Sequence, residues 1–456
     1  MARGTSPQSA RRPRRRSGGP VALREQVQVA PLPALSEAEL AAAFSRGLDL
    51  GEGKPLGHAQ RVCHIALALA DSLALPSETR LAVYYGALLH EAGTAPASAE
   101  LCRLTGINED ALFGRSPLQS PEEVAAELPL TDISAVIETV RRHCEEGAAV
   151  ASRLGLPPEV VQTIHCHHER WDGGGYPQGL SGQNIPEAAR LVAVGDLAES
   201  LIAAESSPLA ARRSIVPALA RFVGAALDPE LLPQAKALIR NDSFWLGLYG
   251  NAAPQMLPSL KPLEDGRRGP ATLHWFAEVF AALADDKGEH TRGHSPRTAR
   301  WAGRLASALG LRREHVQRVE LATLLHHVGL LGVPARVMAK PDILSLAEMQ
   351  VMRRHPSYSH LILERLPGLE DVAAWVHAHH ERPDGRGYPE MLEGDAIPLE
   401  ARIIALAETY VALTSERPYR RALSCQDAQQ VLLGAVGSQL DEELVRLFCT
   451  IATEPD

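Results

Sequence analysis

The chain has 456 residues, of which 45% are hydrophobic, 22% are charged and 4% are aromatic, and its formal net charge at pH 7 is −9. This balance is typical of a globular protein with several domains, and the acidic charge argues against a general nucleic-acid binder. No stretch approaches the ~18–20 apolar residues that cross a bilayer. The six cysteines form no CxxC pair, which favours reduced thiols. We therefore expect a cytoplasmic protein without a membrane span.

The chain begins with a basic segment, which we assign to residues 1–30. Its first twenty residues hold six arginines and no acidic residue, and they lack the apolar core of a signal peptide. We expect a disordered tail. A weak contact with anionic lipid or nucleic acid is the alternative.

The following segments predict helices. Ser36 with Glu39 forms a capping-box pattern, and so does Ser345 with Glu348. Apolar residues at three-to-four spacing predict amphipathic helices over 61–75 and 297–311, and residues 401–413 are apolar enough for a buried helix. Because no run of alternating strands and no βαβ pattern occurs, the fold class we predict is all-α.

One long stretch of the sequence occurs twice. "HHERWDGGGYPQGL" begins at His167 and "HHERPDGRGYPEML" begins at His379, an offset of 212 residues that also relates His143 to His355. Upstream, "ALLHEAG" and "TLLHHVG" are related by an offset of 236, so the first copy carries 24 additional residues. This pattern indicates a tandem duplication. We expect a first domain over 31–240 with an insertion near 95–140, a linker over 241–270 and a second domain over 271–456.

The repeated polar positions are mainly histidines and carboxylates, which suit borderline transition metals. Two such ions about 3.5–4 Å apart clamp a phosphodiester and activate water. A carboxylate next to a histidine can bridge two ions, because it has two oxygens. The predicted metal ligands are His58, His90, Glu91, His143, His167, His168 and Asp196 in the first copy, and His294, His326, His327, His355, His379, His380 and Glu408 in the second.

Both quoted stretches resemble the signature of the HD-GYP domain, a subgroup of the HD superfamily of metal-dependent phosphohydrolases. "GHSPR", "LLHHVGLLGVP", "HPSYSHLIL" and "LTSERPYRRA" of the second half extend the resemblance. It implies two tandem HD-type helical bundles, each intact site with two or three divalent ions, Fe or Mn favoured. It also implies hydrolysis of cyclic di-GMP or a related cyclic nucleotide. The substrate contacts it implies are Gly387, Tyr388, Pro389, Arg417 and Arg420, and the GYP loops are expected to meet diguanylate cyclases.

The name-giving His-Asp doublet is altered in both copies, to His90-Glu91 and His326-His327. The lysine that the family places after the doublet is Thr94 in one copy and Leu330 in the other. A neutral imidazole offers one lone pair and cannot bridge as a carboxylate does. The predicted catalytic residues are therefore Glu91 and Asp196 of the first copy.

Two functions follow from this pattern. The first is a metal-dependent phosphodiesterase in which one copy hydrolyses or each copy keeps half of the function. The alternative is a catalytically degenerate sensor of cyclic dinucleotides, or an interaction scaffold in second-messenger signalling.

Overall fold

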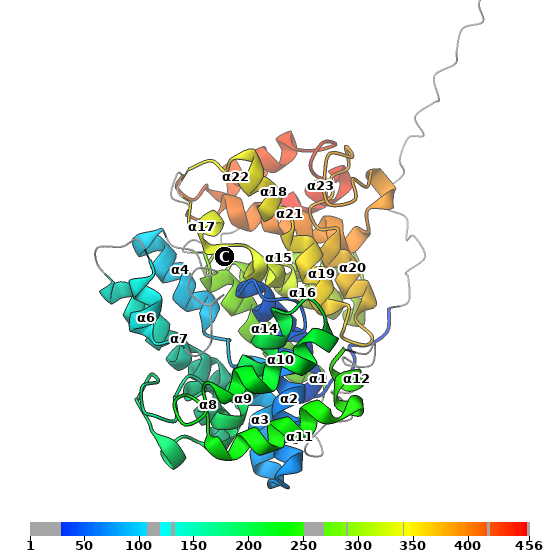
Figure 1. Cartoon of the computed structure of the whole chain (residues 1–456). Helices are drawn as coiled ribbons and strands as arrows, with labels where there is room; N and C mark the ends of the chain where they lie inside the picture. Colours follow the sequence, from blue (N-terminus) through cyan, green and yellow to red (C-terminus); the bar gives the residue numbers. More distant parts are fainter. Residues whose placement is uncertain are drawn as a thin grey trace, which may run out of the picture.

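A computed structural model describes residues 29–106, 119–128, 133–249, 269–288, 291–340, 342–416 and 420–453. These residues form helices joined by short loops, and they contain no β-strand, only isolated bridges such as Asp384 with Glu393. Two helical bundles follow one another along the chain, the first at the bottom of Figure 1 and the second at the top. The predicted all-α class with two tandem HD-type bundles is confirmed.

The first copy begins with a helix whose N-cap Ser36 forms the predicted capping box with Glu39. The helix predicted over 61–75 is observed as α2, which begins three residues earlier. The elements of this copy are α1 (Glu37–Gly51), α2 (His58–Ser72), α3 (Ser77–Leu89), α4 (Thr94–Thr105), α6 (Pro121–Ala126), α7 (Ser134–Arg153), α8 (Pro158–His165), η1 (Gly182–Asn184), α9 (Glu187–Ala203), α10 (Pro208–Ala220), η2 (Pro229–Leu231), α11 (Leu232–Arg240) and α12 (Asp242–Tyr249).

The second copy repeats this order without the insertion. Its elements are α14 (Pro270–Asp286), α15 (His294–Ala308), α16 (Arg313–Leu325), η4 (Val328–Gly332), α17 (Ala335–Met338), α18 (Leu346–Met352), α19 (His355–Leu363), α20 (Glu370–His377), η5 (Gly394–Ala396), α21 (Leu399–Leu413), α22 (Cys425–Gly434) and α23 (Glu442–Ile451). The helix predicted over 401–413 is α21, and eight of its residues are buried. α2 packs against α3 and α9, and α15 packs in the same way against α16 and α21.

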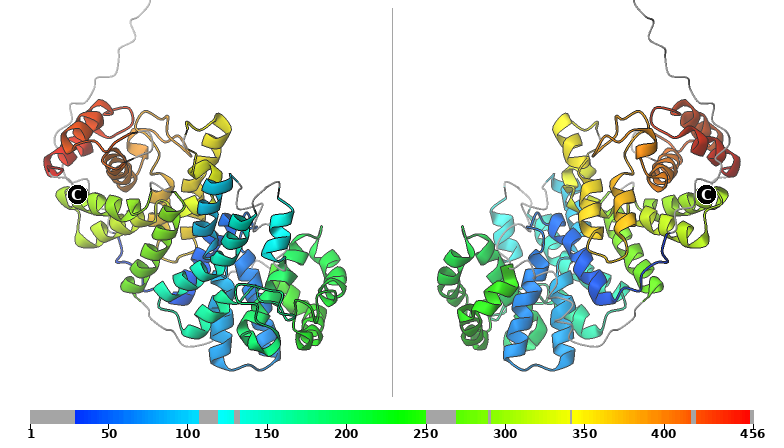
Figure 2. Two further views of the ribbon diagram at one scale, coloured as in Figure 1. Left: turned by 90° about the vertical axis from the view of Figure 1, so that its left-hand side faces the viewer. Right: turned by 90° about the vertical axis from the view of Figure 1, so that its right-hand side faces the viewer.

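The two copies meet through α1 and α14, the first helix of each. Phe44 and Phe280, which the 236-residue offset relates, stack with ring centroids 4.3 Å apart and are fully buried. α1 also packs against η4 and α19 of the second copy. One hydrophobic core contains residues of both copies, and Figure 2 shows the two bundles in contact from either side. The chain is therefore a pseudo-dimer with a continuous apolar interior.

The expected insertion near 95–140 contains most of α4, all of α6 and the first turns of α7. α4 packs on α7 and reaches α14 and α17 of the second copy. The expected linker begins with α12, in which Phe244 and Trp245 are buried against the first copy. Residues 250–268 of the linker, 107–118 and 129–132 of the insertion, and 1–28 of the tail lie outside the described residues.

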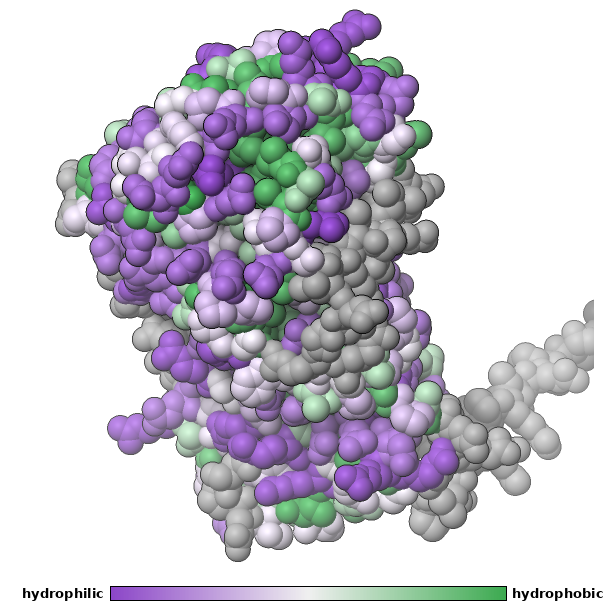
Figure 3. Space-filling view, turned by 90° about the horizontal axis from the view of Figure 1, so that it is seen from below, coloured by the Kyte–Doolittle hydropathy of each residue, from purple (hydrophilic) through white to green (hydrophobic). Residues whose placement is uncertain are grey.

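All six cysteines are free thiols, four of them buried, as expected. Among the helices of the described residues, none combines the length and the apolar character that crossing a bilayer requires. The face seen in Figure 3 is mainly hydrophilic, with apolar side chains gathered in separate patches.

Phe280→Ala tests the contact between the copies. Removing a fully buried phenyl ring costs about 3–5 kcal/mol of unfolding free energy, because a cavity remains. We expect that loss in urea unfolding of the full chain. The matched control is Trp275→Ala on the same helix, where the ring is 45% exposed and the loss should be much smaller. Equal losses would contradict a core shared through α14.

Candidate metal centres

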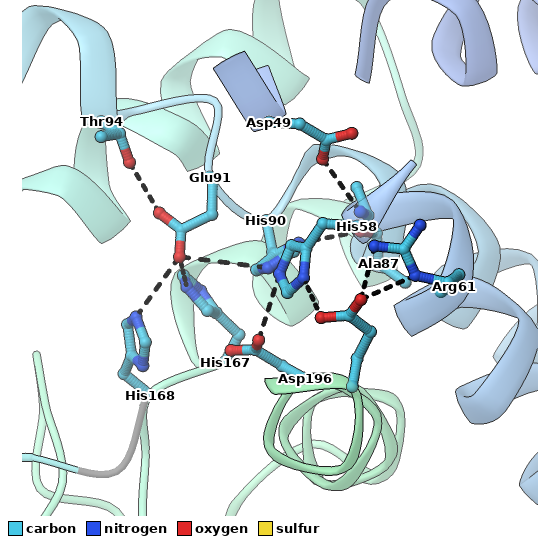
Figure 4. A network of polar contacts seen from close by, with 12 residues as sticks. Asp49, His58, Arg61, Ala87, His90, Glu91, Thr94, His167, His168 and Asp196 are labelled. Carbon is cyan, nitrogen blue, oxygen red and sulfur yellow. Dashed lines mark hydrogen bonds and ion pairs between the residues drawn. The ribbon is translucent and has the colours of Figure 1, made fainter. Parts of the chain in front are cut away.

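The first copy brings all seven of its predicted ligands to one buried place. They lie on five helices or directly after them, and Figure 4 labels all of them except His143. One group consists of His58, His90 and Asp196, and the other of Glu91, His143, His167 and His168. Within each group the donor atoms all lie within 4.8 Å of one another. The helices therefore place two ligand groups side by side.

A glycine in each copy lets two of these helices approach closely. A Cβ atom on Gly93 would lie 1.9 Å from the carbonyl oxygen of His143, and one on Gly329 would lie 2.2 Å from that of His355. No side chain fits there. This explains the glycine three residues after the first histidine of each altered doublet, since it lets the doublet meet the next ligand.

Backbone carbonyls orient the imidazoles. The Nδ1–H groups of His90 and His167 donate to the carbonyls of Ala87 and Ile164, three residues earlier, at 2.8 and 2.6 Å. A carbonyl only accepts, so these rings carry their proton on Nδ1 and present the Nε2 lone pair to the site. Both Nε2 atoms are buried and have no hydrogen-bond partner among the described residues. Buried lone pairs of this kind fit a bound metal ion.

Glu91 lies between the two ligand groups. Its Oε1 is 4.0, 3.9 and 3.8 Å from the Nε2 atoms of His90, His167 and His168. Its Oε2 is 3.9 Å from that of His143 and accepts a hydrogen bond of 2.6 Å from Thr94 Oγ1. Separations near 4 Å are too long for hydrogen bonds, but they suit ligands that share an ion at ~2.0–2.2 Å from each. Glu91 has the place of a bridging ligand.

The electrostatics keep Glu91 and His168 in their ligating forms near neutral pH. Burial raises the pKa of Glu91, but the surrounding histidines, His143 first, hold it well below its usual range. Burial, reinforced by His143, lowers the pKa of His168 to about 4. A carboxylate and neutral imidazoles are the forms that bind divalent metals.

His58 lies between two carboxylates at the start of α2. Its Nε2 is 3.3 Å from Asp196 Oδ1, and its Nδ1 bonds to Glu199. Burial lowers its pKa, but Asp196 and Glu199 together raise it to about 10. Glu199 is held in turn by the guanidinium of Arg61, at 2.6 Å. Asp196 thus has an ordered partner on the side away from Glu91.

The second copy gathers its predicted ligands in the same arrangement. The two groups are His294, His326, His327 and Glu408, and His327, His355, His379 and His380. His327 belongs to both groups, in the place that Glu91 has in the first copy. Glu408 Oε1 lies 3.4 Å from the Nε2 of His327 and 3.9 Å from that of His380. This centre has one carboxylate among six histidines, whereas the first has two among five.

Each GYP loop is anchored by the glutamate that follows its histidine pair. Glu381 accepts the backbone N–H groups of Glu390 and Leu392 at 2.6 and 3.0 Å, and Glu169 does the same in the first copy. The ring of Tyr388 lies on that of His380, with centroids 4.8 Å apart. A Cβ on Gly387 would lie 2.5 Å from a backbone nitrogen. The loop is thereby fixed against the metal ligands.

A cavity of about 610 Å³ opens beside the second centre. Its wall includes His379, His380, Tyr388, Glu408 and Arg420. The Arg420 guanidinium donates to the carbonyls of Leu413 and Ala412, so its position is fixed. Of the predicted substrate contacts, Arg417 lies outside the described residues.

The structure adds charged residues that the sequence did not point to. Glu52 and Lys54 follow α1 and approach the first centre. Burial lowers the pKa of Lys54, but Asp196, Glu52 and Glu91 raise it above its ordinary value. Burial and Glu91 raise the pKa of Glu52 well above its usual range. The repeat did not mark them, because the matching positions in the second copy hold Gly288 and His290; His290 lies outside the described residues.

An all-helical fold with buried clusters of histidines and carboxylates fits the class of metal-dependent phosphohydrolases. The model of the family described as HD domain matches residues 110–231 and 278–444. The chain is 30% identical over 437 residues to the 3'3'-cGAMP-specific phosphodiesterase 3 of Vibrio cholerae, which covers 89% of this chain and 92% of that protein. It is 42% identical over 196 residues to the cyclic di-GMP phosphodiesterase response regulator RpfG of Xanthomonas campestris, covering 42% of this chain and 50% of the relative.

A crystal structure of a cyclic GMP-AMP-specific phosphodiesterase of V. cholerae (V-cGAP3) superposes with a TM-score of 0.67 at 26% identity, covering 93% of this chain and 99% of that one. This chain belongs to the HD-domain family, and the resemblance to HD-GYP proteins is confirmed. The relatives support the expectation of a metal-dependent phosphodiesterase.

The neutral histidines predict acid sensitivity of the metal-free protein. The pKa of a histidine in the unfolded chain is about 6.5, above the value of about 4 for His168. The unfolded chain binds the proton first as the pH falls, so this part of the stability is present above pH 6.5 and is lost toward pH 4. The shift corresponds to ~3 kcal/mol.

Urea unfolding of the chelator-treated chain at several pH values checks this expectation. His168→Gln should show a shallower loss of unfolding free energy between pH 6.5 and 4. Phe280→Ala, which is less stable for another reason, should keep the slope of the unaltered chain. An unchanged slope in His168→Gln would contradict the assignment.

Proposed function

We propose that the chain hydrolyses a phosphodiester bond of a cyclic dinucleotide and that the first copy performs the reaction. The observation that carries the proposal is the place of Glu91 between two groups of buried ligands. The relatives named for 3'3'-cGAMP and cyclic di-GMP suggest these two substrates. We favour 3'3'-cGAMP, because the relative named for it is similar over both copies.

The proposed metal complement is two or three divalent ions in the first centre, with Fe or Mn favoured by the mixed imidazole and carboxylate donors. His58, His90 and Asp196 would hold one ion, and His143, His167 and His168 another, with Glu91 shared. When bound, such ions polarise the phosphate and lower the pKa of water. The predicted catalytic roles of Glu91 and Asp196 are those of charged ligands.

The chain's own residues would prepare this centre. Thr94 fixes one oxygen of Glu91, and carbonyls fix the imidazoles. Lys54 brings a positive charge close to Asp196 and Glu91. We propose that its ammonium contacts the substrate phosphate.

The second copy would bind a nucleotide without hydrolysing it efficiently. Its centre has a histidine where the first has Glu91, while its cavity keeps Tyr388 and Arg420. With fewer carboxylates, a metal-loaded second centre keeps more positive charge, which favours a bound phosphate. Docking of diguanylate cyclases on the GYP loops stays a prediction.

Glu91→Gln and His327→Gln assign the reaction to one copy. We expect Glu91→Gln to lower the rate by about 100-fold or more, as loss of a group that organises transition-state charge does. His327→Gln should stay within a few-fold of the unaltered chain. Anaerobic protein reconstituted with Mn or Fe, with 3'3'-cGAMP and cyclic di-GMP followed by chromatography, provides the measurement. The reverse dependence would place hydrolysis in the second copy, and no product at all would favour a sensor.

Lys54→Met tests the phosphate contact. Loss of one charge contact costs about 1.4 kcal/mol, which is a tenfold fall in kcat/KM. We expect at least this fall, and a smaller one for Lys54→Arg, which keeps the charge. Lys236→Met, at an exposed lysine of α11, is the matched control. If kcat/KM of Lys54→Met equals that of the control, the proposed contact between Lys54 and the substrate phosphate is wrong.

A further inference from the structure

The insertion of the first copy contains a helix that covers its GYP loop. This helix, α6, has no counterpart among the described residues of the second copy, where α18 begins at the position that matches the start of α7. Val124 and Ala125 of α6 belong to a buried apolar cluster. The cluster also contains Tyr176 of the loop, and Val140 and Cys144 of α7. Since α6 lies at the outer edge of the molecule (Figure 1), it separates Tyr176 from the solvent.

An arginine that both copies contain has a different partner in each. In the second copy the guanidinium of Arg353 lies over the ring of Tyr388, 5.2 Å from its centroid. The 212-residue offset relates Arg353 to Arg141 and Tyr388 to Tyr176. Arg141 forms an ion pair of 2.8 Å with Glu122 of α6. The insertion thus engages an arginine that packs on the tyrosine of the loop in the second copy.

The two centres also differ in their access to solvent. The side chain of His168 is 6% exposed, whereas that of its counterpart His380 is 24% exposed and lines the cavity beside the second centre. Both tyrosines of the GYP loops stack on these histidines with centroids 4.8 Å apart. The inner side of the loop is therefore the same in both copies, and the cover on its outer side is what differs.

We propose that α6 is a lid on the first centre, closed in this structure, which moves off α7 and the GYP loop when a cyclic dinucleotide enters. The identity of this ligand rests on the proposed function. The side chains of Arg141 and Glu122 are 47% and 53% exposed, and exposed ion pairs stabilise only weakly. A guanidinium binds phosphate through two parallel hydrogen bonds, so a substrate phosphate can take the place of the Glu122 carboxylate on Arg141.

The competing role for α6 is that of a fixed wall, which stabilises the fold and never opens. Two buried thiols separate the roles. Cys144 is fully buried in the cluster that α6 covers, and Cys63 is fully buried in the main core. Opening of the lid exposes Cys144 alone, whereas unfolding of the chain exposes both thiols.

The experiment treats the full, folded chain with iodoacetamide and follows the labelling of each cysteine by mass spectrometry of its peptides. Glu122→Lys places a like charge opposite Arg141, and we expect it to speed the labelling of Cys144 by about 3- to 10-fold and to leave Cys63 unchanged. Glu442→Lys is the matched control, because it removes an exposed pair of 2.8 Å with Arg446 on α23. It should label like the unaltered chain.

Val124→Ala weakens the lid in a second way, since it removes apolar contact beneath α6. We expect a similar or larger increase in the labelling of Cys144. Circular dichroism shows whether each variant folds, and either one carries the test if the other does not. With 3'3'-cGAMP and cyclic di-GMP as substrates, kcat/KM should rise by the same factor as the labelling rate, because the open fraction sets the apparent affinity.

The labelling and the kinetics can fail separately. If both folded variants label Cys144 no faster than the unaltered chain, or label Cys63 equally fast, α6 is a wall and the lid is wrong. Faster labelling of Cys144 alone, with kcat/KM unchanged, would show that the substrate does not enter under α6 and would also overturn the proposal. Faster labelling of Cys144 in a chain that hydrolyses neither nucleotide would support the lid and overturn only the proposed function.

Discussion

The hydrogen bond from an imidazole Nδ1–H to the carbonyl three residues earlier is the interaction on which both candidate metal centres depend. It occurs at His90, His143 and His167 of the first copy and at His326, His355 and His379 of the second. The last carbonyls of a helix lack intrahelical donors, and an imidazole that follows α3, α8, α16 or α20 supplies one. The bond fixes the tautomer and aims Nε2 away from the helix. Each of these helix ends thereby presents a candidate metal ligand.

The sequence predicted these ligands because duplication acts as an internal comparison. A histidine kept at the same offset in both copies is distinguished from one of the scattered histidines, and the spacing between His58 and His90 recurs between His294 and His326. The helices followed from periodicity and capping boxes, since these depend on neighbours in the chain. The helices depend on neighbouring residues and the candidate ligands are marked by the repeat, so both could be predicted from the sequence alone.

Comparing the two copies cannot reveal a functional residue that only one copy contains. Glu52 and Lys54 stand opposite Gly288 and His290, so no repeat marks them. Their place at the centre depends on how α1 ends against the doublet that follows α3, which is a tertiary contact. Glu169 and Glu381 were repeated in the quoted stretches, but their role as anchors of the GYP loop required the loop's backbone. The candidate ligands that duplication preserved could be predicted from the sequence, whereas the groups that make the copies differ could be found only in the structure.

The two centres are also connected by the packing of helices across the interface between the copies. η4 directly follows the His326-His327 doublet and packs on α1. Leu331 and Ile362 lie so close to α1 that a Cβ on Gly47 would be 3.1 Å from both. α1 ends at Gly51, and the carboxyl group of its C-cap residue, Glu52, interacts electrostatically with Glu91. If the His326-His327 doublet moved toward α1 by a few tenths of an ångström, it would press on a close-packed helix, which yields less than a loop does. The pseudo-dimer thus joins a centre with one carboxylate to a centre with two through a single helix, and Gly47 on that helix leaves room for Leu331 and Ile362 of the second copy.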